Sequence, residues 1–194
     1  AQRMSFLTEY ENEKFKQRGP IKDYGVYGIF DPNQDQKRKT NSIAIEYRAD
    51  VLDNITLAAS TRRDDNSEFK NSNTFRFEII YNLSSQARLR SAYGTAIKNP
   101  TFTERFGFYT NFIGNQFLQP EKSTNWEVGL DKKFFNGNIN LSVTLFNSEL
   151  ENEIDGNVFD PMTFGYTAAN KSRLSKRNGL EINSLGKLSK NITI

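Results

Sequence analysis

Apolar and polar residues alternate along most of this chain, with the period of a β-strand. Phe75, Phe77 and Ile79 share one face of their segment, while Arg76 and Glu78 lie on the other. Successive side chains of a strand point to opposite faces, so this period predicts strands. No stretch sustains the i, i+3, i+4, i+7 spacing of an amphipathic helix, and the sequence therefore predicts an all-β protein. The predicted strands lie near residues 2–16, 40–50, 55–63, 72–82, 87–97, 123–134, 139–150 and 171–187.

Two kinds of connection separate these strands. Short linkers begin with an apolar residue and end with Asn or Gln, and such amide residues suit tight hairpin turns. The short linkers are residues 51–54, 83–86, 135–138 and 188–191. Longer excursions, rich in Gly, Pro, Asn and charged residues, occupy 17–39, 64–71, 98–122 and 151–170. In an antiparallel up-and-down sheet, the short turns then lie at one end and the long loops at the other.

This sorting of the connections favours an outer-membrane β-barrel. Such barrels have short periplasmic turns and long outer loops, whereas a soluble β-sandwich has no reason to sort its loops in this way. The alternation itself fits both, because the polar face can line a wet lumen or face solvent. Aromatic residues beside the short turns favour the barrel, since barrels carry aromatic girdles at the membrane interfaces. These residues are Tyr81, Phe134 and Phe135.

Composition removes several classes of function. The 194 residues include no Cys and no His, which excludes disulfides, thiol enzymes, zinc enzymes and Ser-His-Asp hydrolases within this chain. A net charge of +3, with acids and bases mixed throughout, does not indicate nucleic-acid binding. A mean hydropathy of −0.68 argues against a membrane-spanning helix. It does not argue against membrane-spanning strands, because only one face of such a strand is apolar and the average over both faces is low. We expect no enzyme activity, because no carboxylate pair is placed for acid–base work.

Residues 91–104 resemble a segment of TonB-dependent outer-membrane receptors, in which a strand ending in Tyr-Gly-Thr leads into a long outer loop through a Lys/Arg-x-Pro step. The resemblance continues in the Pro-Glu-Lys-Ser run at 120–123, in the aromatic-Glu pair that follows, and in the Gly-Leu-Glu run at 179–181. Residues 62–69 resemble the family's Arg-x-Asp-x-x-Ser-x-Phe loop. Within the family, the stretch from 93 to 123 is most similar to the vitamin B12 receptor branch, although siderophore receptors share much of it and the branch stays open. The motif residues, for which we expect structural roles, are Tyr93, Gly94, Pro100, Pro120, Glu121, Trp126, Glu127, Gly179 and Glu181.

The resemblance implies an antiparallel transmembrane β-barrel of about twenty-two strands that encloses a plug. Residues 1–194 would then form a partial barrel domain of about seven or eight strands from its C-terminal half, with the plug and the TonB-contacting region absent. The implied location is the outer membrane of a Gram-negative bacterium. The implied function is TonB-dependent uptake of a scarce large nutrient, cobalamin or a ferric siderophore. Outer-membrane lipid and the TonB complex are the other implied partners, and no resident cofactor or metal is expected.

The long loops hold the candidate ligand contacts. Large amphipathic ligands suit aromatic faces combined with a few directional polar groups. The candidates are Arg105, Phe108, Tyr109, Asn111 and Phe112 in the loop at 98–122, with Tyr24 and Tyr27 in the first loop. We expect most of these aromatic rings to pack against each other and hold their loops shut, because long ordered loops bury their own side chains. A secreted β-sandwich binding module and a passive porin are the alternative functions.

Overall fold

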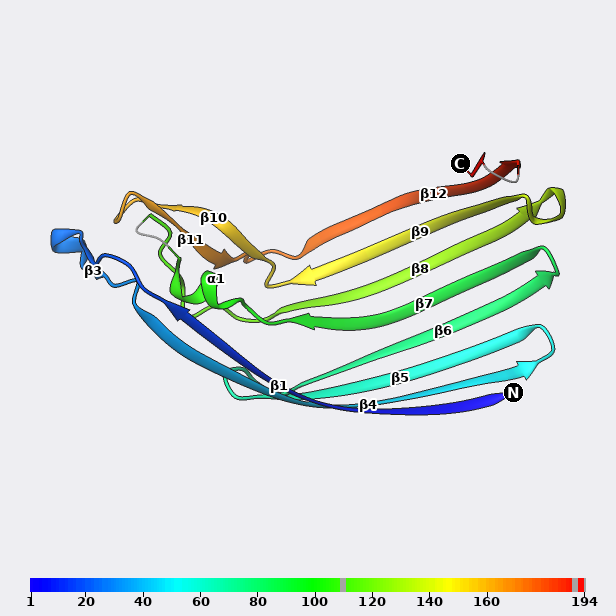
Figure 1. Cartoon of the computed structure of the whole chain (residues 1–194), viewed down its shortest axis with the longest axis horizontal. Helices are drawn as coiled ribbons and strands as arrows, with labels where there is room; N and C mark the ends of the chain where they lie inside the picture. Colours follow the sequence, from blue (N-terminus) through cyan, green and yellow to red (C-terminus); the bar gives the residue numbers. More distant parts are fainter. Residues whose placement is uncertain (109–110, 190–191, 194) are drawn as a thin grey trace.

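A computed structural model describes residues 1–108, 111–189 and 192–193, and all of their side chains except those of 27, 188, 189, 192 and 193. Its main feature is one nine-stranded sheet in the order β1-β4-β5-β6-β7-β8-β9-β12-β13, in which every neighbouring pair is antiparallel (Figure 1). The strands of this sheet are β1 (Gln2–Gln17), β4 (Gln34–Leu52), β5 (Ile55–Asn66), β6 (Ser72–Ser84), β7 (Ala87–Lys98), β8 (Glu121–Phe134), β9 (Ile139–Glu151), β12 (Ser175–Ser189) and β13 (Ile192–Thr193).

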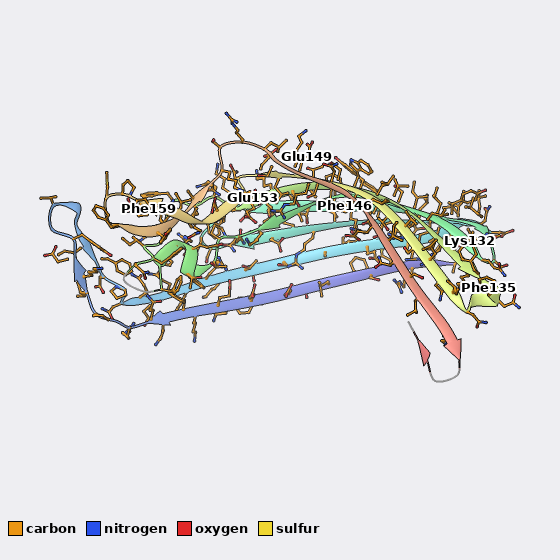
Figure 2. All side chains as sticks on the ribbon, turned by 90° about the horizontal axis from the view of Figure 1, so that it is seen from above. Lys132, Phe135, Phe146, Glu149, Glu153 and Phe159 are labelled. Carbon is orange, nitrogen blue, oxygen red and sulfur yellow. The ribbon has the colours of Figure 1, made fainter. Side chains whose placement is uncertain are left out.

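The sheet is a single curved layer, and no second sheet covers its apolar face in the described part of the chain (Figures 1 and 2). Phe77, Leu145 and Leu180 remain 53%, 53% and 56% exposed. A β-sandwich would bury these side chains between two sheets. The sandwich alternative is therefore wrong, and the predicted fold class, a partial up-and-down barrel, is confirmed.

The polar face of the sheet is the concave one. Arg62 on β5 reaches Glu9 on β1 at 2.9 Å, across the intervening strand β4. Arg76 on β6 similarly reaches Glu127 on β8 at 3.4 Å, across β7. Strands two places apart lie about 10 Å from each other. Side chains bridge that gap readily only where curvature brings their tips together, so charges line the inside and apolar residues the outside.

The short turns and the long connections lie at opposite ends of the sheet, as the sequence predicts (Figure 1). The turn after β8 contains three residues with positive φ: Phe135, Asn136 and Gly137, at 51°, 54° and 92°. Figure 2 shows Lys132 and Phe135 at this short-turn end and Phe159 at the other. The exposed ring of Phe135 lies where an interfacial girdle is expected.

Several strand limits differ from those predicted. Strand β4 begins at Gln34 instead of near 40, and β12 begins at Ser175 instead of near 171. Strand β5 continues to Asn66, which leaves only residues 67–71 to join it to β6. Residues 34–39 are polar at every position and therefore show no alternation, although they pair with β1 without interruption. The alternation of apolar and polar residues therefore reveals a strand only where one face of that strand is apolar.

Some of the predicted loops contain secondary structure of their own. The first loop holds β2 (Lys22–Asp23), the short helix η1 (Gly25–Tyr27) and β3 (Ile29–Phe30). Helix α1 (Phe102–Phe106) follows β7, and the hairpin of β10 (Ile154–Asp160) and β11 (Gly165–Asn170) lies between β9 and β12. The turn after β8, η2 (Phe135–Gly137), is a tight turn with positive φ angles and not a regular helix. Among the described residues, no helix is both long and apolar enough to cross a membrane.

Candidate functional site

The candidate site lies at the long-loop end, where helix α1 begins at a capping box. Thr101 accepts a hydrogen bond from the Glu104 amide at 3.2 Å, and the Glu104 carboxylate accepts one from the Thr101 amide at 2.7 Å. Gly114 then passes so close to the helix that a Cβ atom would lie 2.2 Å from the Phe106 nitrogen. Only glycine fits at that position, so the returning segment is held directly against the helix.

The same loop is joined to the β10–β11 hairpin by backbone and side-chain hydrogen bonds. The Ile113 amide donates to the Tyr166 carbonyl, and the Tyr166 amide donates to the Asn111 carbonyl, both at 2.8 Å. The Gln119 amide donates to the Asn170 side chain at 2.8 Å, and that side chain donates back to the Gln119 carbonyl at 2.9 Å. We call residues 99–108 and 111–120 together with β10 and β11 the loop body.

A small apolar core holds the loop body together. Phe112, Leu118 and Ala168 are 7%, 2% and 0% exposed, and Ile154 packs against them. These residues come from the loop after β7 and from both strands of the hairpin. Burial of such side chains is worth roughly 1.5–3 kcal/mol each for the larger ones. The two loops therefore form one packed unit.

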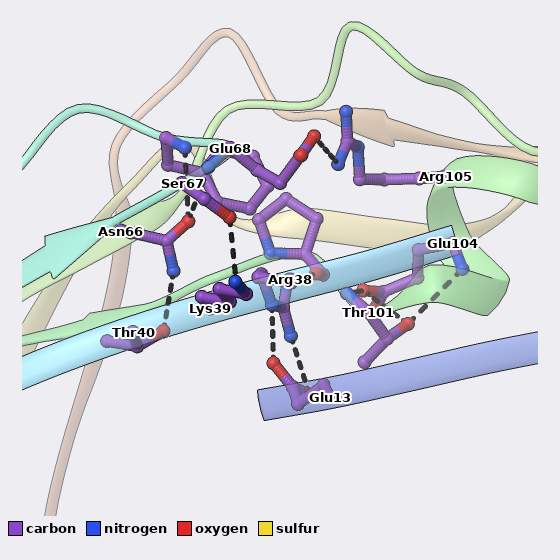
Figure 3. Close-up of polar contacts among 12 residues, drawn as sticks. Glu13, Arg38, Lys39, Thr40, Asn66, Ser67, Glu68, Thr101, Glu104 and Arg105 are labelled. Carbon is purple, nitrogen blue, oxygen red and sulfur yellow. Dashed lines mark hydrogen bonds and ion pairs between the residues drawn. The ribbon is translucent and has the colours of Figure 1, made fainter. Parts of the chain in front are cut away.

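Arg38 attaches this unit to the concave wall (Figure 3). Its side chain is 9% exposed, and its guanidinium donates to both carboxylate oxygens of Glu13 on β1, at 2.5 and 2.9 Å. It also donates to the Pro100 carbonyl at 2.7 Å and lies 5.0 Å from the centre of the Phe102 ring. Phe102 in turn stacks on Phe15 at 5.5 Å. One buried cation thus connects β1, β4 and the start of α1.

Arg105, predicted as a ligand contact, lies in a second attachment (Figure 3). Its side chain is 12% exposed and lies 5.0 and 5.1 Å from the centres of the Phe69 and Phe106 rings. One nitrogen is 3.3 Å from the Glu68 carboxylate, while Nε is buried and has no hydrogen-bond partner in the described part of the chain. This placement favours a role in holding residues 67–71 against α1.

A groove of about 670 Å³ opens between helix α1 and the hairpin. Among the described residues, aromatic rings, amides, hydroxyls and a single carboxylate line it, and none of them is basic. Such a lining suits a large ligand with flat or hydroxyl-bearing surfaces. The lining residues are Thr101, Thr103, Glu104, Phe108, Asn111, Phe112, Gly156, Asn157 and Tyr166.

The groove brings together three of the predicted ligand residues. Phe108 is 44% exposed and its ring lies 5.0 Å from that of Phe112, while Asn111 is exposed beside them. Phe112 belongs mainly to the apolar core, as expected for loops whose aromatic rings pack together. Tyr109 lies outside the described residues.

The other two candidates are in the first loop, and Tyr24 is not among the residues that line this groove. Tyr24 is half-buried, with the Lys22 ammonium 5.0 Å from the centre of its ring. Tyr27 ends helix η1, and its side chain is outside the described part of the structure. The structure thus separates Tyr24 from the candidates in the loop after β7.

Four of the motif residues lie in β7 or at the two ends of the loop that follows it. Gly94 is buried, and a Cβ there would meet the Phe75 carbonyl oxygen at 2.7 Å. Pro100 is among the most buried side chains, and its carbonyl accepts from Arg38. Pro120 is half-buried and directly precedes β8, and the next residue, Glu121, accepts a hydrogen bond from the Ile154 amide at 2.7 Å. These contacts are consistent with the structural roles expected for the motif.

The remaining motif residues lie on the two faces of the wall. Tyr93 and Trp126 are directly opposite each other on β7 and β8 and point outward, 46% and 44% exposed. Glu127 lies on the concave face near Arg76. A Cβ on Gly179 would lie 2.9 Å from the Phe146 ring, so glycine makes room for that inward-facing ring. Glu181 is exposed and lines a hollow of about 340 Å³ together with Phe146.

Glu153 closes the base of the hairpin loop. Hydrogen bonds from the Ser175 hydroxyl, the Lys171 ammonium and the Arg177 guanidinium lower the pKa of the Glu153 carboxyl from 4.5 to about 2. Lys171 Nζ lies 3.0 Å from this carboxylate, and its amide donates to the Glu153 carbonyl at 2.8 Å. The ionised carboxylate therefore joins both ends of residues 152–174.

This arrangement predicts an acid-sensitive loop. A lowered pKa contributes stability that is present above the unfolded value of 4.5 and is lost as the pH falls towards about 2. We expect protection of the Lys171 amide, measured by hydrogen exchange in the full-length parent and corrected for intrinsic rate, to decline across that window. Glu153→Gln should remove the decline, whereas Glu151→Gln, a change at an exposed neighbour, should leave it intact. An unchanged profile in Glu153→Gln would contradict this assignment.

Sequence reasoning missed Arg38, Asn157 and Tyr166. The contact of Arg38 with Pro100 joins residues 62 apart in the chain, so no local pattern indicates it. Asn157 and Tyr166 lie in a stretch predicted as irregular loop, without a motif. Helix α1 did leave a local signal, because Thr101 and Glu104 have the spacing of a capping box.

Comparison with known proteins adds a family match. A family model described as "TonB dependent receptor-like, beta-barrel" matches residues 2–192. Among solved structures, the siderophore receptor PirA from Pseudomonas aeruginosa superposes with a TM-score of 0.77 at 18% identity, over 99% of this chain and 35% of that one. A ferric enterobactin receptor variant (PfeA) from the same organism, in complex with enterobactin, gives 0.73 at 13% identity, over 99% and 32%.

A third similar structure is the hemophore receptor HasR from Serratia marcescens, with a TM-score of 0.66 at 14% identity, over 95% of this chain and 39% of that one. At these identities the superpositions show the fold. The chain spans about a third of the length of the solved structures it matches. None of these three is a vitamin B12 receptor, so they do not support the closeness to that branch inferred from the motifs.

Proposed function

Because the chain belongs to the β-barrel family of TonB-dependent receptors, which are outer-membrane proteins of Gram-negative bacteria and not enzymes, we propose that its parent protein takes up a ferric siderophore. The observation that carries the proposal is the aromatic and amide-lined groove between α1 and the β10–β11 hairpin. It lies at the long-loop end, which in an outer-membrane barrel faces the outside of the cell.

The chemistry of the groove indicates which part of a ligand it contacts. Its single carboxylate and lack of basic lining residues disfavour a concentrated negative charge at this position. Its rings and amides instead suit the flat or amide-bearing arms of an iron chelate. Cobalamin, which is also large and amide-rich, is the second candidate on the same chemistry. Coupling to TonB is part of the proposal for the whole protein.

Ligand binding by the full-length parent tests the proposal directly. We expect saturable binding of a ferric siderophore, and uptake in cells that ceases when TonB is deleted. Tyr166→Ala should weaken binding about tenfold, which corresponds to roughly 1.4 kcal/mol of lost ring contact. The matched control is Phe164→Ala, a change at the 79% exposed hairpin tip outside the groove. Binding of cobalamin alone, or uptake that persists without TonB as in a passive porin, would overturn the siderophore assignment.

A further inference from the structure

The outward face of β1 and β4 changes from apolar to basic towards the long-loop end. On β1, Phe6 and Tyr10 are followed on the same face by Lys14 and Lys16. On β4, which runs the other way, Lys37 and Lys39 precede Ile43 and Ile45 in the sequence and lie nearer the long loops. We define the lysine patch as Lys14, Lys16, Lys37 and Lys39, together with Arg63 on the adjacent strand β5.

The strand register establishes that the lysine patch points outward. Lys14 is directly opposite Lys37, and both are exposed. The neighbouring pair, half-buried Glu13 and buried Arg38, lies on the concave side beside the start of helix α1. Adjacent residues of a strand point to opposite faces, so the lysines must project from the convex side. The register of β1 and β4 is uninterrupted from Gln2 to Gln17, which keeps this assignment constant along the pair.

The patch lies at the height of the lipid headgroups. Ile43 is the outward apolar residue of β4 that lies nearest the long loops. Lys39 is four residues further towards those loops, or about 13 Å along the strand. A strand tilt of about 40° reduces this to about 10 Å along the membrane normal. Lysine side chains can also extend back towards an interface while their apolar stems cover the surface. The Lys39 ammonium therefore reaches the polar layer just outside the hydrocarbon, while Lys37 and the directly opposite Lys14 lie about 7 Å further out along the strands.

The described part of the chain balances only part of the positive charge in this patch. Lys16 Nζ lies 3.5 Å from Asp35, and Arg63 Nε lies 2.9 Å from Asp65. In the described part of the chain, Lys14, Lys37 and Lys39 form no ion pair. Like charges directly opposite each other on paired strands repel. An anion that approaches the outer wall would relieve that repulsion.

The far side of the sheet provides an internal contrast. On its outward face at the same end, Lys176 on β12 pairs with Glu149 on β9 at 2.8 Å. Lys122 on β8 is directly opposite Glu151. Each of these two lysines has a carboxylate neighbour on the adjacent strand, unlike Lys14, Lys37 and Lys39.

We propose that the lysine patch binds the phosphate groups of the phosphorylated glycolipid in the outer leaflet, lipopolysaccharide. The proposal follows from the outer-membrane location of the family and does not depend on which ligand the receptor transports. Phosphates at headgroup height supply the negative charge that the patch lacks, and each lysine near a charged membrane surface adds to the attraction. The bound phosphates then fix how deeply this side of the barrel lies in the membrane, and the bound lipid stays against its outer wall.

Native mass spectrometry of the full-length parent in detergent, with added lipid A as the probe, tests the proposal. We expect the triple variant K14Q/K37Q/K39Q to lose about a hundredfold in affinity for bis-phosphorylated lipid A at low ionic strength. The control variant K122Q/K176Q should bind like the unmodified protein. Binding by the unmodified receptor should also weaken steeply with added salt, a readout that needs no variant.

Three results would overturn the proposal. One is equal binding of lipid A by the triple variant and the unmodified receptor, with both running as folded barrels in heat-modifiability gels. Another is equal binding of dephosphorylated lipid A, which would assign the contact to acyl chains. The third is full displacement of lipid by millimolar inorganic phosphate, which would make the patch a site for free anions and not for a membrane lipid.

Discussion

Replacing Glu13 with Ala is expected to lower the free energy of unfolding of the full-length receptor by about 3 kcal/mol. The change leaves the guanidinium of Arg38, 9% exposed, without the two carboxylate oxygens that neutralise it. The Pro100 carbonyl and the Phe102 ring remain, but neither carries a full negative charge. The start of α1 should loosen with the arginine, so protease cleavage within 99–120 should accelerate. Urea unfolding in lipid vesicles measures the first effect, and limited proteolysis the second.

Glu11→Ala is the matched control. Glu11 lies on the same face of β1, two residues away, is exposed, and is opposite Thr40 instead of an arginine. We expect its loss to change the free energy of unfolding by less than about 0.5 kcal/mol. If the two variants unfolded alike, Arg38 would not be the anchor of the loop body.

Leu130→Arg should destabilise the barrel by about 3 kcal/mol, because an arginine on the lipid face near the bilayer midplane is expensive. Leu130 is 42% exposed on the convex side, directly opposite Leu89 and Val143. It lies on β8 halfway between Trp126 and Phe134, so the guanidinium would be far from both membrane interfaces. Urea unfolding in vesicles of defined thickness measures the cost.

The same arginine on the other face should be tolerated. Ser60 is on the concave side of β5, directly opposite Glu46 and Arg76, where charges already gather. Ser60→Arg is expected to cost less than about 1 kcal/mol. A larger cost for Ser60→Arg than for Leu130→Arg would reverse the assignment of lumen and lipid to the two faces.

The strands and their inward and outward faces were predictable from sequence because one face of each meets lipid. Phe75 and Phe77 alternate with Arg76 and Glu78, and the structure places the first pair outside and the second inside. Where a strand extends beyond the membrane, that contrast disappears. Residues 34–39 have polar side chains on both faces, so their pairing with β1 was missed.

The candidate site was much less predictable, because it depends on contacts between distant segments. Phe108 and Asn111 were found through their residue types, but Tyr166 and Asn157 enter the groove only because the hairpin pairs with the loop after β7. Arg105 has the chemistry of a ligand contact, yet Phe69 and Glu68 from another loop surround it. Residue type indicates what a side chain can do, while loop packing decides what it meets.

The hydrogen bonds between residues 111–113 and β11 have a mechanical consequence. They join helix α1 and the hairpin into one unit, so that the two cannot move independently. We therefore expect a ligand that displaces Tyr166 to move residues 111–113 with it. Substitutions in the two segments should act non-additively on ligand dissociation, because the segments are hydrogen-bonded to each other.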